Sequence, residues 1–200
     1  MVFADRFDAF IFDLDGTILR LPVDWESART RLKAVFHHDS EFIPLFGTLQ
    51  KFLAQRPELR AQAFSAIDQF EIDAVEGAEP VSGSLDLLLR LSARAALALV
   101  TMQGTKACYA LVRKFSMQTL FRCCITREDS LDRSEQIAIA MGRVGCSAHR
   151  TLFVGDRLND VVAARKAGVE VVVLGRTVDG KTQPDHSFLT TSEFASFLSS

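Results

Sequence analysis

The sequence lacks the features that mark membrane proteins, nucleic-acid-binding proteins and cysteine–metal proteins. None of its apolar runs is long enough to cross a bilayer, and its acidic first residues do not fit a secretory signal. The formal net charge is −2 and the basic residues are scattered, so no patch is expected to attract nucleic acid or an anionic membrane. The four cysteines form no CxxC pair and no zinc spacing, which favours buried free thiols. We therefore expect a cytoplasmic protein with neither a membrane nor a nucleic-acid partner.

The composition that remains is that of a globular protein. The chain has 200 residues, of which 48% are apolar and 24% are charged, enough to bury a sizeable core. This length allows one domain, or one domain that carries an insertion.

An apolar run followed by two aspartates is the strongest motif. Residues 9–12 are Ala-Phe-Ile-Phe, and residues 13–17 are Asp-Leu-Asp-Gly-Thr. A continuous apolar run predicts a strand buried on both faces, as in a parallel sheet. Asp13 and Asp15 then start on the same side, at the carboxyl end where such sheets bind ligands. Paired carboxylates favour a neutralising cation, and oxygen ligands favour Mg²⁺; taken alone, the motif also fits a polar turn.

A second motif with acidic residues follows a later apolar strand. Residues 150–154 predict the strand, and residues 155–160 read Gly-Asp-Arg-Leu-Asn-Asp. Gly155 allows the chain to turn tightly, so that Asp156 faces the first motif. Asp160 lies one helical turn later and can reach the same site.

The chain alternates strands with helices outside one segment, which predicts an α/β fold with a doubly wound parallel sheet. Residues 20–77 differ, because they show three helical patterns and no convincing strand. We expect a small all-helical cap at 20–77, inserted after the first strand, and a core domain at 1–19 and 78–200. The expected cap helices are 24–36, 40–55 and 57–75; the further strands are 95–100, 119–126 and 169–174, and the further helices include 105–115, 132–143 and 192–198.

The two aspartate motifs resemble those of the haloacid dehalogenase (HAD) superfamily. The resemblance covers residues 8–18 and 79–175, and the cap places it near the phosphoglycolate phosphatases and β-phosphoglucomutases. It implies a HAD-like Rossmannoid core whose first strand is central, between the strands of Thr101 and Asp156. It also implies a cap that selects the substrate. Most members are Mg²⁺-dependent phosphatases that form an aspartyl phosphate.

The resemblance also implies roles for single residues. Asp13 would be the nucleophile and Asp15 the general acid and base. Mg²⁺ would be held by Asp13, the backbone carbonyl of Asp15 and Asp156, with Asp160 as a further ligand or an orienting group. The residues expected to bind phosphate are Gly16, Thr17, Thr101 and Met102.

Two positions depart from the family pattern. Many relatives have Asn after the threonine, where this chain has Met102. The family usually has a lysine near the start of the helix at 132–143, but no lysine lies between Lys114 and Lys166. We assign this role to Arg133, with Arg127 as the competitor; Arg133 as an ordinary solvated helix residue is the alternative.

The function expected from the resemblance is hydrolysis of a small phosphorylated metabolite by a phosphoric monoester hydrolase. The second aspartate of the first motif, Asp15, argues against dehalogenation. One alternative is a sugar phosphomutase of the same fold. The other is a catalytically weak descendant that binds phosphate or a protein, which the missing lysine and Met102 favour. No motif names the substrate or the oligomeric state.

Overall fold

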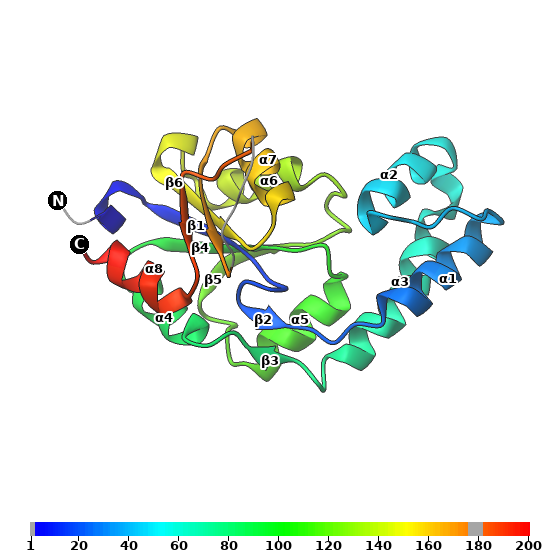
Figure 1. Ribbon diagram of the computed structural model, residues 1–200, viewed down its shortest axis with the longest axis horizontal. Helices are drawn as coiled ribbons and strands as arrows, with labels where there is room; N and C mark the ends of the chain where they lie inside the picture. The colour runs from blue at the N-terminus through cyan, green and yellow to red at the C-terminus, as the bar shows by residue number, and fades with distance from the viewer. Residues whose placement is uncertain (1–2, 176–181) are drawn as a thin grey trace.

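A parallel sheet of six strands forms the centre of the computed structural model, which describes residues 3–175 and 182–200 (Figure 1). The strand order is β5-β4-β1-β6-β7-β8, and every neighbouring pair is parallel. The strands are β1 (Ala9–Asp13), β4 (Ala96–Val100), β5 (Phe121–Ile125), β6 (Thr151–Gly155), β7 (Glu170–Leu174) and β8 (His186–Phe188). As expected, β1 is central, between the strand that precedes Thr101 and the strand that precedes Asp156.

Helices cover both faces of this sheet, so the apolar run of β1 is buried throughout. On one face Ile11 belongs to a cluster that includes side chains of α6 (Arg133–Val144) and α7 (Leu158–Ala167). On the other face Phe10 and Phe12 belong to a cluster with side chains of the remaining core helices. These helices are α4 (Ser84–Ser92), α5 (Thr105–Lys114) and α8 (Thr191–Leu198). The predicted α/β doubly wound fold is confirmed.

A helical segment stands beside the sheet, on the right in Figure 1. It contains α1 (Trp25–Phe36), α2 (Leu45–Gln55), the 3₁₀ turn η2 (Pro57–Leu59) and α3 (Arg60–Ala74). Its own hydrophobic cluster centres on the fully buried Phe42, Leu49 and Ile67, and two side chains from core loops, Met102 and Leu131, pack against it. We call this segment the cap; the domain boundaries at 20–77 stay a prediction.

The structure also contains short elements that the sequence patterns did not indicate. The strands β2 (Leu19–Arg20) and β3 (Glu79–Pro80) pair antiparallel and join the two connections between cap and core. Two residues are too few to show a strand period. The second cap helix begins at Leu45 rather than 40, because Phe42 has a positive φ of 47° that a helix does not accept. The strand β8 and the 3₁₀ turns η1 (Phe3–Arg6) and η3 (Ala148–Arg150) are further additions.

The cysteines are free thiols, as expected, although only Cys108 is fully buried; Cys123, Cys124 and Cys146 are half-buried. Within the described ranges, no helix combines the length and the hydrophobicity needed to cross a membrane.

Candidate active site

Three aspartates from two distant segments converge at one end of the sheet. Asp13 is the last residue of β1, Asp156 directly follows β6, and Asp160 lies in the first turn of α7. One carboxylate oxygen of each lies within 4.8 Å of those of the other two. Because β1 and β6 are parallel neighbours, their carboxyl ends lie side by side, which brings the two motifs together. Asp160 Oδ2 also accepts the backbone N–H groups of Asp156 (3.2 Å) and Arg157 (3.1 Å), which holds the turn.

Two glycines make this close approach possible. Gly16 has a φ of +88°, and a Cβ there would lie 2.4 Å from Oδ2 of Asp156. A Cβ on Gly155 would lie 2.5 Å from Oδ2 of Asp160. Neither position has room for a larger residue unless a site carboxylate moves, and the positive φ of Gly16 favours glycine there as well.

The carboxylates are crowded in a site that is shielded from solvent. Burial raises the pKa of Asp13 to about 7, and the guanidinium of Arg133 opposes this shift. The neighbouring carboxylates at positions 160, 156 and 15 raise the pKa further. Clustered carboxylate oxygens are also the donor set that Mg²⁺ prefers. The residues therefore fit a divalent cation, which would relieve the repulsion among them.

Asp15 lies in the same pocket, but its carboxylate is not part of the three-aspartate cluster. Burial raises the pKa of Asp15, while a hydrogen bond from the backbone N–H of Leu21 (3.2 Å) and the charge of Arg157 oppose the shift. A carboxyl group with a raised pKa beside a substrate pocket is suited to proton transfer. The position of Asp15 fits its predicted role as acid and base.

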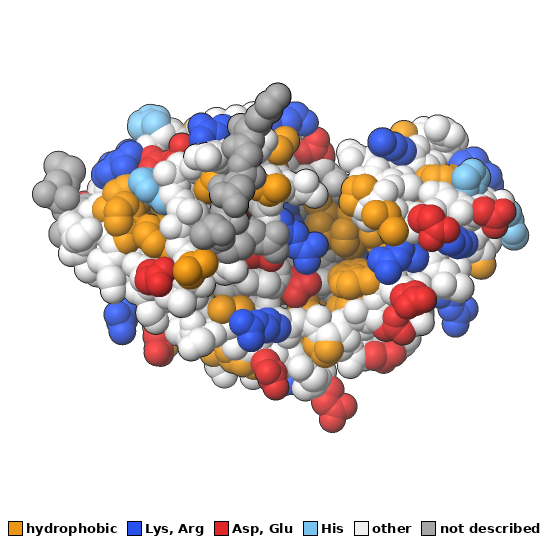
Figure 2. Space-filling model, viewed as in Figure 1, with side chains coloured by type: hydrophobic (Ala, Val, Ile, Leu, Met, Phe, Trp, Pro, Cys, Tyr) orange, Lys and Arg blue, Asp and Glu red, His pale blue; other side chains and the backbone are white. Residues whose placement is uncertain are grey.

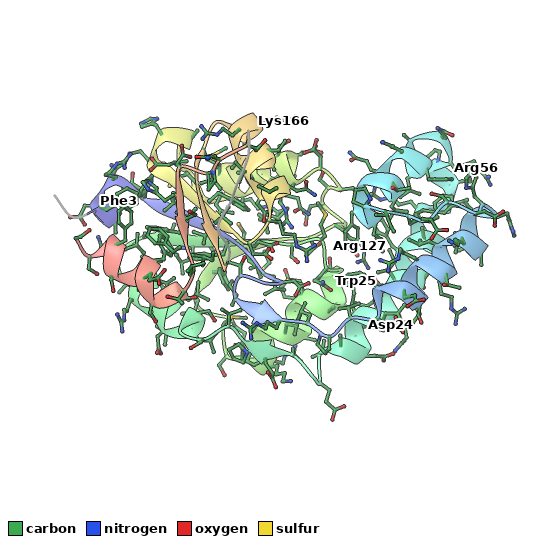
Figure 3. All side chains as sticks on the ribbon, in the orientation of Figure 1. Phe3, Asp24, Trp25, Arg56, Arg127 and Lys166 are labelled. Atoms are coloured by element: carbon green, nitrogen blue, oxygen red, sulfur yellow. The ribbon has the colours of Figure 1, made fainter. Side chains whose placement is uncertain are left out.

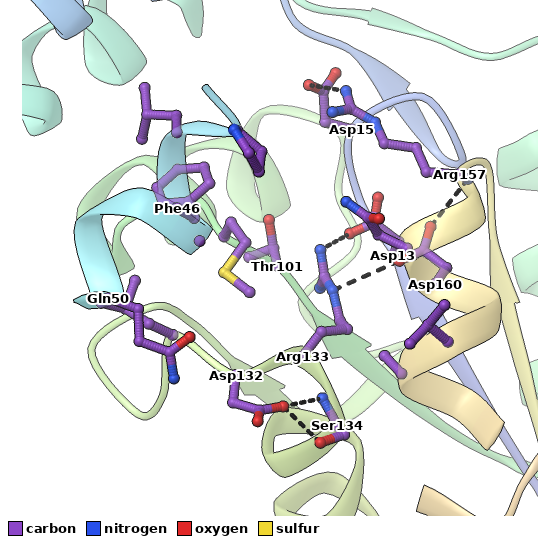
Figure 4. Close-up of a pocket in the computed structure, with 18 of the residues that line it drawn as sticks. Asp13, Asp15, Phe46, Gln50, Thr101, Asp132, Arg133, Ser134, Arg157 and Asp160 are labelled. Atoms are coloured by element: carbon purple, nitrogen blue, oxygen red, sulfur yellow. Dashed lines mark hydrogen bonds and ion pairs between the residues drawn. The ribbon is translucent and has the colours of Figure 1, made fainter. Parts of the chain in front are cut away.

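Arg133 is the basic residue next to Asp13. Its Nη2 lies 2.7 Å from Oδ1 of Asp13, and its Nε lies 3.6 Å from Oδ1 of Asp160. Figure 4 shows the side chain pointing toward both carboxylates, with a dashed line to each. Arg133 is the first residue of α6, which directs it at the carboxyl end of the sheet. The geometry thus favours Arg133 over Arg127 for the role that lysine usually has in the family.

Arg127 instead joins the cap to the core. Its side chain has no solvent exposure and pairs with Glu71 (2.5 Å) and with Asp68, both on α3. Figure 3 labels Arg127 where the core meets the helical segment. The Nη1 of Arg127 also donates to the carbonyl oxygen of Met102 at 3.2 Å. Glu71 in turn accepts the backbone N–H of Gly104 at 2.9 Å. The cap helix is therefore held to the loop that follows β4.

The start of α6 depends on Asp132, which caps the helix just before Arg133. Its carboxylate accepts the backbone N–H groups of Ser134 (2.8 Å) and Glu135 (3.3 Å) and pairs with Lys166 at 2.7 Å. The bond from Lys166 and those from Ser134 lower the pKa of Asp132 to about 2. The N-cap residue Asp132 therefore fixes the first turn of α6, which presents Arg133.

We expect Asp132→Ala to lower the free energy of unfolding by about 1 kcal/mol at pH 7, the usual value of an N-cap. The folded-state pKa lies below the unfolded one, so the contribution is present above about pH 4 and disappears as the pH falls towards 2. Urea unfolding of both proteins across this range measures it. Asp132→Asn, which keeps a capping oxygen, is the control and should lose less; equal losses for the two variants would contradict the capping role.

The loop after β4 presents polar groups to the same pocket. The hydroxyl of Thr101 accepts the backbone N–H of Gln103 at 3.1 Å, which leaves its own proton available to a ligand. Gln136 of α6 donates to the carbonyl oxygens of Thr101 and Ser130, both at 2.9 Å, and so ties this loop to the Arg133 segment. Met102 lines the pocket as an apolar group that packs on the cap cluster.

These groups surround a cavity of about 560 Å³ between the cap and the carboxyl end of the sheet. We call it the cap–core pocket; Figure 2 shows a hollow between the two parts of the molecule with hydrophobic side chains in it. Six of the residues predicted from the sequence line it: Asp13, Asp15, Thr101, Met102, Arg133 and Asp160. Asp156, Gly16 and Thr17 do not line it. Asp156 belongs to the carboxylate cluster, and Gly16 and Thr17 lie in the turn after β1.

Sequence reasoning missed several residues of the pocket and its supports. Gln103 is buried and lines the pocket, and its Oε1 has no hydrogen-bond partner among the described residues. Arg29 and Gln50 line the pocket from the cap. In the sequence, Glu71 looks like any charged residue of an amphipathic helix, so nothing marked it as buried. None of these four has a motif around it, although the glutamine two residues after Thr101 could have been compared with the asparagine of the family.

A family model described as haloacid dehalogenase-like hydrolase matches residues 10–174. This range runs from β1 to the end of β7, so it contains both aspartate motifs, the cap and the Arg133 segment. No curated protein matches the sequence.

Solved structures of similar fold cover nearly the whole chain. A protein from Haemophilus somnus described as a predicted phosphoglycolate phosphatase is 21% identical with a TM-score of 0.67, over 96% of this chain and 97% of that one. CbbY from Rhodobacter sphaeroides in complex with phosphate is 19% identical with a TM-score of 0.70, over 94% and 96%. The HAD hydrolase YfnB from Bacillus subtilis, bound to magnesium, is 20% identical with a TM-score of 0.63, over 96% and 99%. At these identities the likeness establishes the fold.

Proposed function

Because the chain belongs to the haloacid dehalogenase-like hydrolase family, we propose that it is a Mg²⁺-dependent phosphatase that acts on a small phosphorylated metabolite. The observation that carries the proposal is the convergence of the Asp13, Asp156 and Asp160 carboxylates beside Arg133. Together they form a cation site next to a cavity large enough for a small substrate. The similar structures described as a phosphatase or bound to phosphate support this class of reaction.

Asp13, Asp156 and Asp160, with the backbone carbonyl of Asp15, are the groups that would hold Mg²⁺. The bound ion would offset the clustered carboxylate charge and stabilise the charge of the phosphoryl group during transfer. The similar structure bound to magnesium supports the choice of metal.

The residues of the chain then divide the reaction between them. The carboxylate of Asp13 attacks phosphorus, and the bond from phosphorus to the leaving oxygen breaks, which gives an aspartyl phosphate. Asp15 donates its proton to the leaving oxygen and later takes a proton from the water that attacks the intermediate. This second step releases phosphate and restores Asp13. Arg133 and Thr101 bind the phosphoryl oxygens and offset their charge.

The test is release of phosphate from 4-nitrophenyl phosphate by the purified protein in millimolar Mg²⁺. We expect turnover that stops with EDTA and returns when Mg²⁺ is added back. No release under these conditions would contradict the proposal. A sugar phosphate assayed in parallel, with its products analysed, separates hydrolysis from movement of the phosphate within the sugar.

The missing lysine and Met102 favour the alternative of a catalytically weak descendant. The 2.7 Å contact between Arg133 and Asp13 supports an active enzyme instead, because a cation occupies the place beside the predicted nucleophile. The free cysteines support the cytoplasmic location that we expected. The pocket between cap and core supports the division into a core and a substrate-selecting cap at 20–77.

We expect Arg133→Ala to lower kcat/KM for 4-nitrophenyl phosphate by about 10²- to 10³-fold, because one preorganised donor to the phosphoryl group is lost. Arg133→Lys should keep more activity than the alanine variant, since the charge remains. Steady-state kinetics at saturating Mg²⁺ measures both. Arg143→Ala is the matched control, because this residue of the same helix is half exposed and pairs with Asp129. Wild-type activity in Arg133→Ala would exclude the role.

A further inference from the structure

Among residues 3–175 and 182–200, the charged groups that line the cap–core pocket are paired, with one exception. Arg133 contacts Asp13, and Lys166 pairs with Asp132 at 2.7 Å. Arg157 reaches Asp15 at 3.9 Å and Asp156 at 3.7 Å. Arg29, which lines the pocket from α1, has no hydrogen bond and no ion pair to any part of the chain that the structure describes. Its charge reaches Asp24 and Glu41 only at longer range.

Apart from Arg29 and Gln50, the side chains that the cap contributes to the pocket wall are apolar. Trp25 and Phe46 of the cap meet edge to face, with 5.8 Å between ring centroids, and both line the pocket. Pro44 and Leu45 extend this wall, and Met102 and Leu131 contribute from the core side. Among the described residues of the cap, Arg29 and Gln50 are the charged and amide side chains that line the pocket.

This wall disfavours a sugar as the leaving group. Each hydroxyl of a sugar must keep a hydrogen-bond partner when it leaves water, or its desolvation goes uncompensated. Arg29 and Gln50 cannot provide hydrogen-bond partners for all the hydroxyls of a sugar ring. Aromatic and aliphatic side chains instead pack well against an alcohol with an apolar body. One planar guanidinium matches the two oxygens of a carboxylate. A second phosphate dianion would favour more than one cation, and Arg29 is the single cation that the described residues of the cap contribute to the pocket.

We propose that the substrate is a phosphate monoester whose alcohol part has an apolar, planar body and a carboxylate. The body lies against Trp25 and Phe46, and the carboxylate binds Arg29, with Gln50 as a second donor. This inference rests on the proposed function, since it assumes that the phosphoryl group lies at Asp13. Arg29 is then a specificity residue that acts on binding of the leaving group and not on the chemical step.

The first experiment measures binding without turnover. The probes are 4-(phosphonomethyl)phenylacetate and its amide, which differ in one charge and cannot be hydrolysed. We expect calorimetry in Mg²⁺ to show the carboxylate binding about ten- to a hundred-fold more tightly, the scale of a hydrogen bond to a charged group. Arg29→Gln should remove this preference and leave the affinity for the amide unchanged. Equal binding of both probes by the wild type would overturn the proposal.

The matched control is Arg31→Gln, because Arg31 is an exposed arginine of the same helix that does not line the pocket. It should keep the preference. If Arg31→Gln loses the preference as well, Arg29 does not recognise the carboxylate and the proposal is wrong. The proposal is also wrong if Arg29→Gln lowers the affinity for both probes equally.

The second experiment uses the phosphate esters of 4-hydroxyphenylacetate and 4-hydroxyphenylacetamide. We expect Arg29→Gln to raise KM for the carboxylate ester about ten-fold or more, with kcat nearly unchanged and the amide ester unaffected. A preference in binding without hydrolysis of either ester would overturn the proposed function and support this inference. Hydrolysis of both esters with equal kcat/KM would support the proposed function and overturn this inference.

Discussion

Asp13→Asn is expected to lower the turnover of 4-nitrophenyl phosphate by about 10⁴-fold or more, the scale on which loss of a nucleophile acts. A neutral amide cannot attack phosphorus as the carboxylate does, and the substitution also removes one of the three clustered carboxylates that we propose as metal ligands. Phosphate release at millimolar Mg²⁺ measures the change. Retained activity would discard Asp13 as the nucleophile.

The fold of this variant should be intact, and circular dichroism and urea unfolding check this. Burial raises the pKa of Asp13 to about 7, so at pH 8 the native state holds an ionised group that burial disfavours. The variant should therefore be at least as stable as the wild type, as is common when an active-site charge is removed. Asp73→Asn, an exposed residue of α3, is the control and should change neither activity nor stability.

Arg127→Met is expected to lower the free energy of unfolding by about 3–5 kcal/mol, the usual effect of removing one partner of a buried ion pair. The side chains of Arg127 and Glu71 have no exposure, so the variant leaves the Glu71 carboxylate buried without its cation. Urea unfolding measures the loss. The double variant with Glu71→Gln should recover part of it, because the uncompensated charge is removed.

The control for Arg127→Met is Arg150→Met. Arg150 pairs with Asp8, but both side chains are more than one-third exposed, and exposed pairs contribute about 0–1 kcal/mol. If the Arg127 and Arg150 variants lose equal stability, the buried pair is not a special contact between cap and core. A double variant no more stable than Arg127→Met would show that the buried Glu71 charge is not the cause.

The buried pair also has a consequence for the site. Glu71 of α3 accepts the N–H of Gly104, and Arg127, which pairs with Glu71, donates to the carbonyl oxygen of Met102. The buried pair therefore contacts both ends of the loop that carries Gln103. A Cβ on Gly104 would lie 2.6 Å from Nη2 of Arg127, so the contact tolerates no larger residue without rearrangement. The cap position and the loop beside Thr101 are therefore mechanically linked.

Much of the fold and part of the site could be predicted from local patterns. The apolar run at residues 9–12 indicated a strand buried on both faces, and β1 is such a strand. Parallel strands place their carboxyl ends at one edge, so Asp13 and Asp156 could be expected to meet although they are far apart in the chain. The helical character of the cap could be predicted from the 3.6-residue spacing of its apolar residues. The start of α2 could not, because the positive φ of Phe42 leaves no mark in the pattern of apolar residues.

The sequence by itself determined the parallel sheet, the all-helical segment after its first strand and the aspartates that meet at its edge, and the family resemblance added that the first strand is central. Only the tertiary structure decided which arginine stands beside Asp13, that Arg127 pairs with Glu71, and that Arg29 lines the pocket without an ion pair to any described residue. The physical reason is the distance along the chain over which each feature is encoded. Strand burial, helix period and strand-end position are encoded within a few neighbouring residues, whereas the partner of a charged side chain depends on how the cap packs against the core.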